Sequence, residues 1–387
     1  MFKHRQHLLL GVLAAATLTA APAQAQVPSA TVTASDAVGM RYVGTDADNN
    51  VRITLTNSRF TIDDVVPVTA GIGCNAVAGD PTQATCFAPK VGVKFKGFVA
   101  SAGAGNDTVV NATSTATVEG APMQANGSVG NDVLVGDSKT DDVLSGSTGD
   151  DELRDAGGRN ELTGSSGNDK LVGGFGLDEL VGGPDNDVLD GALNSDKLFG
   201  GSGNDQLQGG GSDDQLDGGL GADTIDGGQT GIAVGERHDV VIYSSRTTPV
   251  HVNLKRTDAT QGTPANPALG VPAEGDTIVD VEDVSSGNGK DLLIGNEFDN
   301  NLSGAGGDDV LSGDRGMDRL LGGDDNDSIF PSPAPSIQVP FGAVRDFVSD
   351  IIDCGGLSAG DGDPGDQAFR VVLDQDFAND CATVILQ

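Results

Sequence analysis

The strongest constraint on the fold of this chain is a nine-residue period that occupies residues 146–228. A leucine or isoleucine recurs at every ninth position, and an aspartate or asparagine stands two residues before each of them. Glycine fills most of each intervening turn, as in Gly200-Gly-Ser-Gly-Asn-Asp205. The apolar positions are Leu144, Leu153, Leu162, Leu171, Leu180, Leu189, Leu198, Leu207, Leu216 and Ile225. The polar positions are Asp142, Asp151, Asn160, Asp169, Asp178, Asp187, Asp196, Asp205, Asp214 and Asp223.

A nine-residue unit cannot bury its leucine alone, so it must stack on copies of itself. Three residues around the leucine, such as Lys170-Leu171-Val172, suffice for a short strand, and six glycine-rich residues suffice for a turn. Two units then make one eighteen-residue coil with a strand on each face and both leucines inside. The period therefore predicts an all-β solenoid.

Residues eighteen apart would lie in neighbouring coils, about 4.8 Å apart along the stack. The polar positions then form two rows of carboxylates, one on each edge of the solenoid. At that spacing, and at an effective dielectric near 20, adjacent carboxylates repel by roughly 3 kcal/mol, so a cation is expected between them. Ca²⁺ suits the rows because it takes six to eight oxygen ligands, including backbone carbonyls. A calcium-free solenoid would not favour an aligned acidic row, and a disordered Gly/Asp linker would not need a leucine at every ninth residue.

These turns resemble the RTX (haemolysin-type) calcium-binding nonapeptide repeat, G-G-x-G-x-D-x-U-x. The resemblance implies a parallel β-roll with several calcium ions between turns of adjacent coils. It also implies a β-rich N-terminal leader and a C-terminal cap closed by a disulfide. We expect the ion sites next to Asn160 to be weak, because an amide is a poorer ligand than a carboxylate. The candidate ligands are Asp132, Asp142, Asp151, Asp169, Asp178, Asp187, Asp196, Asp205, Asp214, Asp223, Asp291, Asp309, Asp318 and Asp327.

The period divides the chain into segments. It breaks after Gly228, where strand-like stretches and a polar excursion at 255–274 indicate continued coils with one long loop. It resumes with Leu293, each leucine again preceded by Asp or Asn. We expect a signal peptide (1–25), a β-rich N-terminal leader (26–126), a first repeat array (127–228), an interrupted β-roll segment (229–286), a second array (287–330), and a Pro-rich linker with a C-terminal cap (331–387).

The N-terminus has the pattern of a secretory signal. A basic start precedes an apolar run at 8–19, and Ala23-Gln-Ala25 forms an A-x-A cleavage site. The run is too short to span a bilayer comfortably, and we find no second long apolar stretch. Cleavage after Ala25 and release to the extracellular medium are therefore expected.

Four cysteines fall into two local pairs. In an exported protein such pairs predict the disulfides Cys74–Cys86 and Cys354–Cys381. A zinc site is the alternative, but the spacings are wrong and no histidine lies near. His238 and His251 alternate with apolar residues, which predicts outward-facing strand positions.

The net charge of the chain and the absence of two catalytic motifs argue against several classes of function. A formal net charge of −35 excludes nucleic acid as a natural partner and favours cations. No H-E-x-x-H or G-x-S-x-G motif occurs, so we expect no enzymatic activity, although a paired-carboxylate polysaccharide-active enzyme lacks a motif that could exclude it. We expect a secreted calcium-binding protein with a structural or binding role. The alternatives are a cell-surface adhesin or matrix component with a polysaccharide or cell-surface partner, and the polysaccharide-active enzyme.

Overall fold

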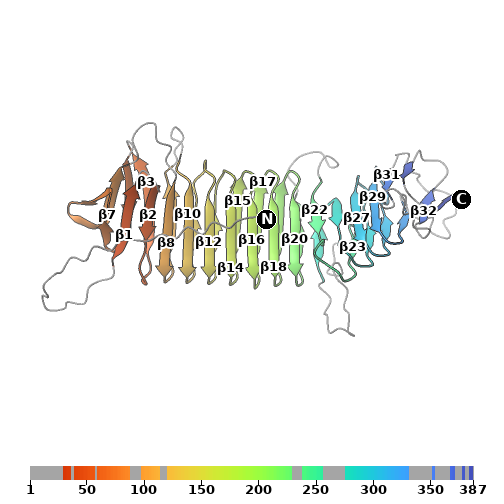
Figure 1. The fold of residues 1–387 in the computed structure, drawn as a ribbon, viewed down its shortest axis with the longest axis horizontal. Helices are drawn as coiled ribbons and strands as arrows, with labels where there is room; N and C mark the ends of the chain where they lie inside the picture. Colours follow the sequence, from red (N-terminus) through yellow and green to blue (C-terminus); the bar gives the residue numbers. More distant parts are fainter. Residues whose placement is uncertain are drawn as a thin grey trace, which may run out of the picture.

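The protein is a long roll of stacked β-coils whose strands run across the long axis (Figure 1). The computed structural model describes residues 29–35, 39–56, 59–87, 97–113, 120–228, 238–255 and 275–330, and the backbone of short strands at 351–353, 367–370, 377–379 and 383–386. The expected signal peptide, most of the loop at 255–274, the Pro-rich linker and the Cys354–Cys381 disulfide lie outside these residues. No helix occurs within the described ones.

The first sheet has sixteen strands and forms one face along the length of the roll. Its strands are β1 (Ala30–Ser35), β2 (Gly39–Val43), β5 (Val68–Ala70), β8 (Phe98–Ala104), β10 (Met123–Val129), β12 (Val143–Thr148), β14 (Glu161–Ser166), β16 (Glu179–Pro184), β18 (Lys197–Ser202), β20 (Gln215–Leu220), β22 (Val240–Ile242), β25 (Asp283–Ser285), β27 (Asn301–Gly306), β29 (Arg319–Asp324), β31 (Ile351–Asp353) and β33 (Phe377–Asn379).

Two further sheets divide the other strands between them. The second sheet has twelve strands: β3 (Asn50–Thr56), β4 (Arg59–Asp63), β6 (Cys74–Val77), β7 (Asp80–Phe87), β9 (Thr108–Ala112), β11 (Val133–Val135), β13 (Glu152–Arg154), β15 (Lys170–Phe175), β17 (Val188–Leu193), β19 (Gln206–Gly211), β21 (Thr224–Asp226) and β24 (Thr277–Val279). The third has six: β23 (His251–Asn253), β26 (Leu292–Ile294), β28 (Val310–Ser312), β30 (Ser328–Phe330), β32 (Gln367–Arg370) and β34 (Thr383–Leu386).

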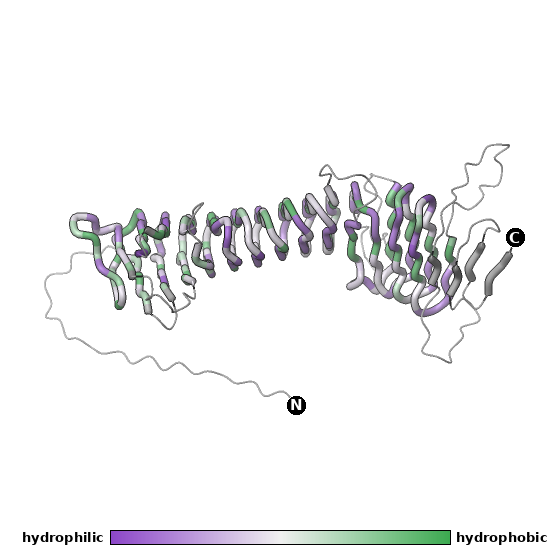
Figure 2. The backbone as a smooth tube through the Cα atoms, turned by 90° about the horizontal axis from the view of Figure 1, so that it is seen from above, coloured by the Kyte–Doolittle hydropathy of each residue, from purple (hydrophilic) through white to green (hydrophobic). Residues whose placement is uncertain are grey.

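The expected eighteen-residue coil is confirmed by the strand register. Leu171 pairs with Leu189 in β15 and β17, and Leu180 pairs with Leu198 in β16 and β18. All ten repeat leucines and isoleucine are at most 2 % exposed, so the two faces share one thin apolar interior. Seen from above, the coils follow one another along a single axis (Figure 2). The parallel β-roll is therefore the fold of the described arrays.

Most strands of the first array are longer than the three residues expected from the sequence. β15 runs through Gly173 and Gly174 to Phe175, and Gly174 still pairs with Ala192 of the next coil. Gly174 adopts a φ of 95°, a left-handed conformation that glycine tolerates without strain. The chain thus bends while it keeps its ladder hydrogen bonds, and the turn proper shortens to Gly176–Asp178.

The N-terminal region continues the roll instead of standing apart from it. β2 pairs in parallel with β8, and β3 pairs in parallel with β9. Antiparallel pairs are confined to β1, β2, β3, β4, β6 and β7 among the described strands. The predicted Cys74–Cys86 disulfide is present and joins β6 to β7. Parallel coiling therefore begins before residue 127, where the repeat period becomes visible.

The interrupted segment follows a less regular path than continued coils with one loop. β22 extends the first sheet, and β23 then starts the third sheet. The chain afterwards returns to place β24 beside β21 in the second sheet. The strand order along the stack therefore differs from the chain order at this point, and one face of the roll is split between two sheets.

Candidate metal centre

The fourteen predicted ligands lie in the turns, immediately before the strands that carry the buried leucines. Each of them is at most 3 % exposed. Their burial follows from the coil, since a residue two positions before an inward-facing leucine points to the same side of the extended chain. The roll thus holds an acidic side chain inside nearly every turn of the arrays.

Each carboxylate is held by the neighbouring coil through one of its two oxygens. The Oδ1 atom of Asp187 accepts a hydrogen bond from the backbone N–H of Asp169 at 2.8 Å, and Oδ1 of Asp205 accepts one from Asp187 at 2.8 Å. The opposite edge repeats the arrangement, with Oδ1 of Asp196 bonded to the N–H of Asp178 at 2.8 Å. The second array does so as well, from Asp291 to Asp309 at 2.8 Å. The two rows predicted from the eighteen-residue spacing are present.

In most of these aspartates the second carboxylate oxygen is buried and receives no hydrogen bond. A buried, ionised oxygen without a donor costs free energy unless a cation or a proton compensates it. The aspartates with such an Oδ2 atom are Asp107, Asp132, Asp151, Asp155, Asp169, Asp178, Asp187, Asp196, Asp205, Asp291 and Asp309.

Glycine at the first position of each turn makes room for this oxygen. A Cβ atom on Gly182 would stand 2.3 Å from Oδ2 of Asp187, and one on Gly200 would stand 2.5 Å from Oδ2 of Asp205. Any side chain there would displace the carboxylate. The first glycine of the repeat is therefore required by the aspartate five residues later.

Burial also disfavours ionisation of these carboxyl groups. It raises the pKa of Asp151, Asp169 and Asp187 to about 6, against hydrogen bonds from the preceding coil that act in the opposite direction. Burial raises the pKa of Asp196 and Asp309 to about 8. A cation along either edge would therefore stabilise the ionised form of these carboxyl groups.

The donor set fits a hard cation. Within the described part of the chain, no three His, Cys, Asp or Glu side chains converge on one point, so side chains alone do not complete a coordination shell. The remaining ligands of an ion between turns would be backbone carbonyls, which Ca²⁺ accepts beside carboxylates. Soft metals are disfavoured because no thiolate or imidazole belongs to the rows.

A comparison with known families agrees with this geometry. A family model described as RTX calcium-binding nonapeptide repeat (4 copies) matches residues 138–171, 163–198, 199–229, 285–320 and 312–330. The two arrays belong to the RTX calcium-binding repeat family. A comparison with curated proteins found no match. RTX repeats bind calcium in general, so calcium is the ion that the rows are suited to hold.

The RTX rows extend into segments where the sequence period is not visible. Oδ1 of Asp132 accepts the N–H of Asp107, and Oδ1 of Asp107 accepts the N–H of Asn49. Past the first array, Oδ1 of Asp239 accepts the N–H of Asp214, and Oδ1 of Asp276 accepts that of Asp223. Sequence reasoning missed Asp239 and Asp276 as row members and did not include Asp107 among the ligands. The signal was present, because each stands two residues before a buried Val or Ile.

The row that runs from Asn49 through Asp151 to Asp276 accepts a hydrogen bond from a tyrosine hydroxyl at each end. Tyr243 donates to Oδ2 of Asp276 at 2.6 Å. At the N-terminal end, Tyr42 donates to Oδ1 of Asn49 at 3.1 Å and to Oδ2 of Asp64 at 2.5 Å. These are the two tyrosines of the chain, and both are buried. Neutral hydroxyls thus supply hydrogen bonds where the aspartate row stops.

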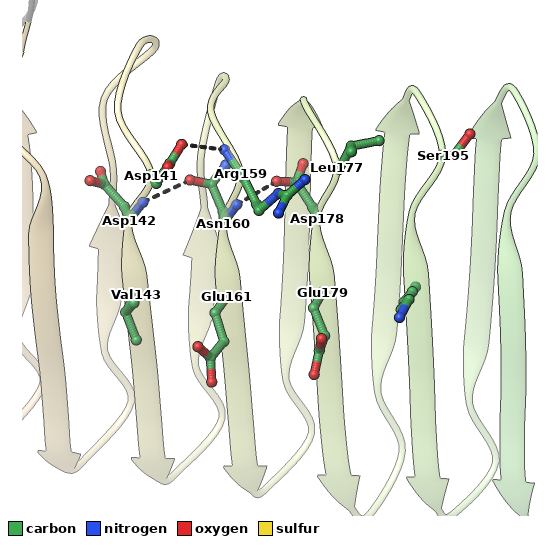
Figure 3. A pocket seen from close by; sticks show the side chains of 11 residues that line it. Asp141, Asp142, Val143, Arg159, Asn160, Glu161, Leu177, Asp178, Glu179 and Ser195 are labelled. Carbon is green, nitrogen blue, oxygen red and sulfur yellow. Dashed lines mark hydrogen bonds between the residues drawn. The ribbon is translucent and has the colours of Figure 1, made fainter.

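A groove of about 490 Å³ lies over the other row, here called the second row, at the position where Asn160 stands between Asp142 and Asp178 (Figure 3). Oδ1 of Asn160 accepts the N–H of Asp142 at 3.0 Å, and the N–H of Asn160 is bonded to Oδ1 of Asp178 at 2.7 Å. Arg159 and Lys197 line the groove. The amide therefore preserves the hydrogen-bond ladder while removing one negative charge.

The two described histidines are not part of the rows. His251 is exposed at the start of β23, as expected. His238 lies before β22 and not within a strand, with Nδ1 3.4 Å from a carboxylate oxygen of Asp283. Of the residues that the structure describes, none forms a helix long and apolar enough to cross a membrane.

Proposed function

We propose that this RTX protein is an extracellular calcium-binding protein without catalytic activity, whose roll folds when calcium becomes available after export. The observation that carries the proposal is the set of buried carboxylate oxygens without donors along both edges. Such oxygens destabilise the metal-free roll, and a cation that binds only the folded state offsets this cost.

The chain's own residues prepare each site. The leucines hold the two faces together, the first glycine leaves space for the carboxylate, and the hydrogen bond to Oδ1 orients it. A bound calcium ion would compensate the negative charge of the second carboxylate oxygen, which has no hydrogen-bond donor. At a calcium concentration ten times the dissociation constant, each site would add about 1.4 kcal/mol to the stability of the fold.

Export explains how such a chain could avoid folding too early. Cytosolic calcium is too low to occupy sites of millimolar to submillimolar affinity, whereas extracellular modules have affinities in that range. RTX repeat proteins are typically secreted, and the pattern of residues 1–25 favours a cleaved signal peptide. We therefore place folding outside the cell.

Circular dichroism tests this proposal directly. Purified protein should gain a β signal as calcium is added and lose it when a chelator is added. Magnesium at the same concentration serves as the control, because it prefers near-octahedral sites and dehydrates reluctantly. A β signal that is unchanged by chelator would refute calcium-driven folding.

The absence of catalytic activity needs its own test. The sequence lacks the motifs of metalloproteases and lipases, but paired carboxylates leave glycosidase chemistry open. Protein purified with calcium should release no reducing ends from uronate polymers. Calcium-dependent release that is lost on chelation would show a polysaccharide-active enzyme instead.

A further inference from the structure

One turn of the first array departs from the repeat at both ends. The segment Asp155-Ala-Gly-Gly-Arg-Asn160 carries an aspartate where the other turns begin with glycine, and an asparagine where they end with aspartate. The turn therefore keeps one carboxylate but moves it by five residues. Asn160 leaves the second row with one negative charge fewer, and Asp155 adds one negative charge at the start of the same turn.

The side chain of Asp155 is fixed in place. It follows β13 and is 7 % exposed. Its Oδ1 atom accepts hydrogen bonds from the backbone N–H groups of Ala156 at 2.6 Å and Gly157 at 2.9 Å. Its Oδ2 atom is buried and receives none. One oxygen is thus used by the turn, and the other is left for a ligand.

That oxygen points toward Asp142 of the preceding coil. A Cβ atom on Gly136 would stand 1.7 Å from Oδ2 of Asp155 and 2.6 Å from Oδ2 of Asp142. Both oxygens therefore border the same small space, which exists because residue 136 has no side chain. The fully buried Asp142 is oriented by hydrogen bonds from Met123 N–H at 2.8 Å and Thr140 Oγ1 at 3.0 Å to Oδ1, and from Asp137 N–H at 3.0 Å to Oδ2.

The pair has no cationic partner of its own. Neither Asp142 nor Asp155 forms an ion pair with a side chain in the described ranges. Two buried carboxylates that face each other repel strongly, so either a cation or a shared proton must lie between them. Two carboxylate oxygens are the kind of ligand that a hard divalent cation prefers.

We propose that Asp142 and Asp155 form an additional divalent-cation site between two coils, which takes Ca²⁺ in place of the site that Asn160 weakens. The site differs from the repeat sites because one of its carboxylates comes from the first position of the turn. It rests on the proposed calcium-dependent folding, since its ion would be one of those that stabilise the roll.

The test compares calcium stoichiometry in the full chain by equilibrium dialysis at saturating calcium. Asp155→Asn keeps the oxygen that accepts from Ala156 and Gly157 but removes the charge. We expect it to bind about one ion fewer than the wild type and to melt at a lower temperature in calcium. Glu161→Gln is the matched control, because this acid is exposed on β14 next to the same turn and should leave both values unchanged.

A second variant keeps the proposal falsifiable if Asp155→Asn fails to fold. The double change Asp155→Gly with Asn160→Asp converts the turn to the regular repeat and should restore the wild-type stoichiometry. Unchanged stoichiometry in Asp155→Asn would overturn the site and would indicate a shared proton. That result is distinct from failure of the proposed function, in which the wild type itself would bind no calcium.

Discussion

At the scale of single residues, the two oxygens of a row aspartate such as Asp187 have different roles. Oδ1 belongs to the hydrogen-bond ladder between coils, and Oδ2 faces a space without donors. Asparagine can perform the first role but not the second. Asn160 therefore occupies a row position without breaking the ladder, because its Oδ1 accepts the N–H of Asp142. Asn300 keeps contact with the preceding coil in another way, since its Nδ2 donates to the backbone oxygen of Glu282 while its Oδ1 accepts the N–H of Asn296 in its own turn.

Asp187 offers the first test at this scale. Asp187→Asn should weaken calcium binding while the roll still forms, and Asp187→Ala should also cost about 1 to 3 kcal/mol of stability through the lost acceptor. Adding Asp205→Asn, in the same row, should give a non-additive loss of affinity in calorimetric titration. Adding Asp196→Asn, on the other edge, should be additive. Equal coupling in both pairs would contradict the two-row geometry.

Gly203 tests the close approach of the coils. It has a φ of 145°, and a Cβ there would stand 1.7 Å from the backbone oxygen of Asp185. Gly203→Ala should therefore lower the free energy of unfolding in calcium by more than about 2 kcal/mol, as expected for strain in a packed interior. Gly79→Ala is the control, since Gly79 also has a positive φ but nothing lies within 4 Å of the added atom. The free energies of unfolding are measured by urea unfolding. Similar decreases for both variants would show that the positive φ, and not the close contact with the neighbouring coil, causes the destabilisation.

At the scale of elements, each strand depends on its neighbours in the stack and on how the stack ends. The ladder hydrogen bonds of β15, β16, β17 and β18 are all formed with other coils. A coil at the end of a row lacks one such neighbour. The tyrosine hydroxyls at Asn49 and Asp276 supply hydrogen bonds at these positions.

Tyr243→Phe tests this role. Loss of the hydrogen bond to the Asp276 carboxylate should destabilise that end by about 1 to 3 kcal/mol. The chain has no tryptophan and two tyrosines, so each Tyr→Phe variant leaves one emitter, at the opposite end. Thermal unfolding should show a lower midpoint by circular dichroism in Tyr243→Phe, with a smaller change in Tyr42 emission. A variant as stable as the wild type by both measurements would exclude a stabilising role.

At the scale of the whole molecule, the roll is a nearly one-dimensional stack of coils (Figure 1). Buried aspartates line its two edges. Each coil contacts mainly the coils before and after it, so stability is a sum of local terms. Every local term contains a buried carboxylate. The state of protonation and of calcium binding should therefore act on the whole length of the arrays together.

The pH dependence of the calcium-free protein follows from this. Burial raises the pKa of Asp132, Asp151 and Asp205 to about 6, above their unfolded value, so the folded chain binds more protons than the unfolded one. Without calcium, stability should rise as the pH falls from 8 toward 5. With calcium present, protons compete with the ion and the trend should reverse. Melting temperatures at both pH values, with and without calcium, check the sign, and a parallel trend in both series would contradict it.

The sequence by itself determined the coil length, the two rows and the buried leucines. A period of nine converts directly into contacts between residues eighteen apart, because each coil rests on the next. The Cys74–Cys86 disulfide was equally local. The spacing alone therefore places most candidate ligands in rows, although calcium binding at individual residues stays a prediction.

Only the tertiary structure decided what happens where the period fails. It brought Asp155 against Asp142, placed Asp107, Asp239 and Asp276 in the rows, and set Tyr243 at a row end. It also placed β24 beside β21 and β23 beside β26, so β24 precedes β23 along the stack although it follows β23 in the chain. The physical reason is that irregular loops carry no repeat, so their contacts depend on the path by which the chain returns to the stack.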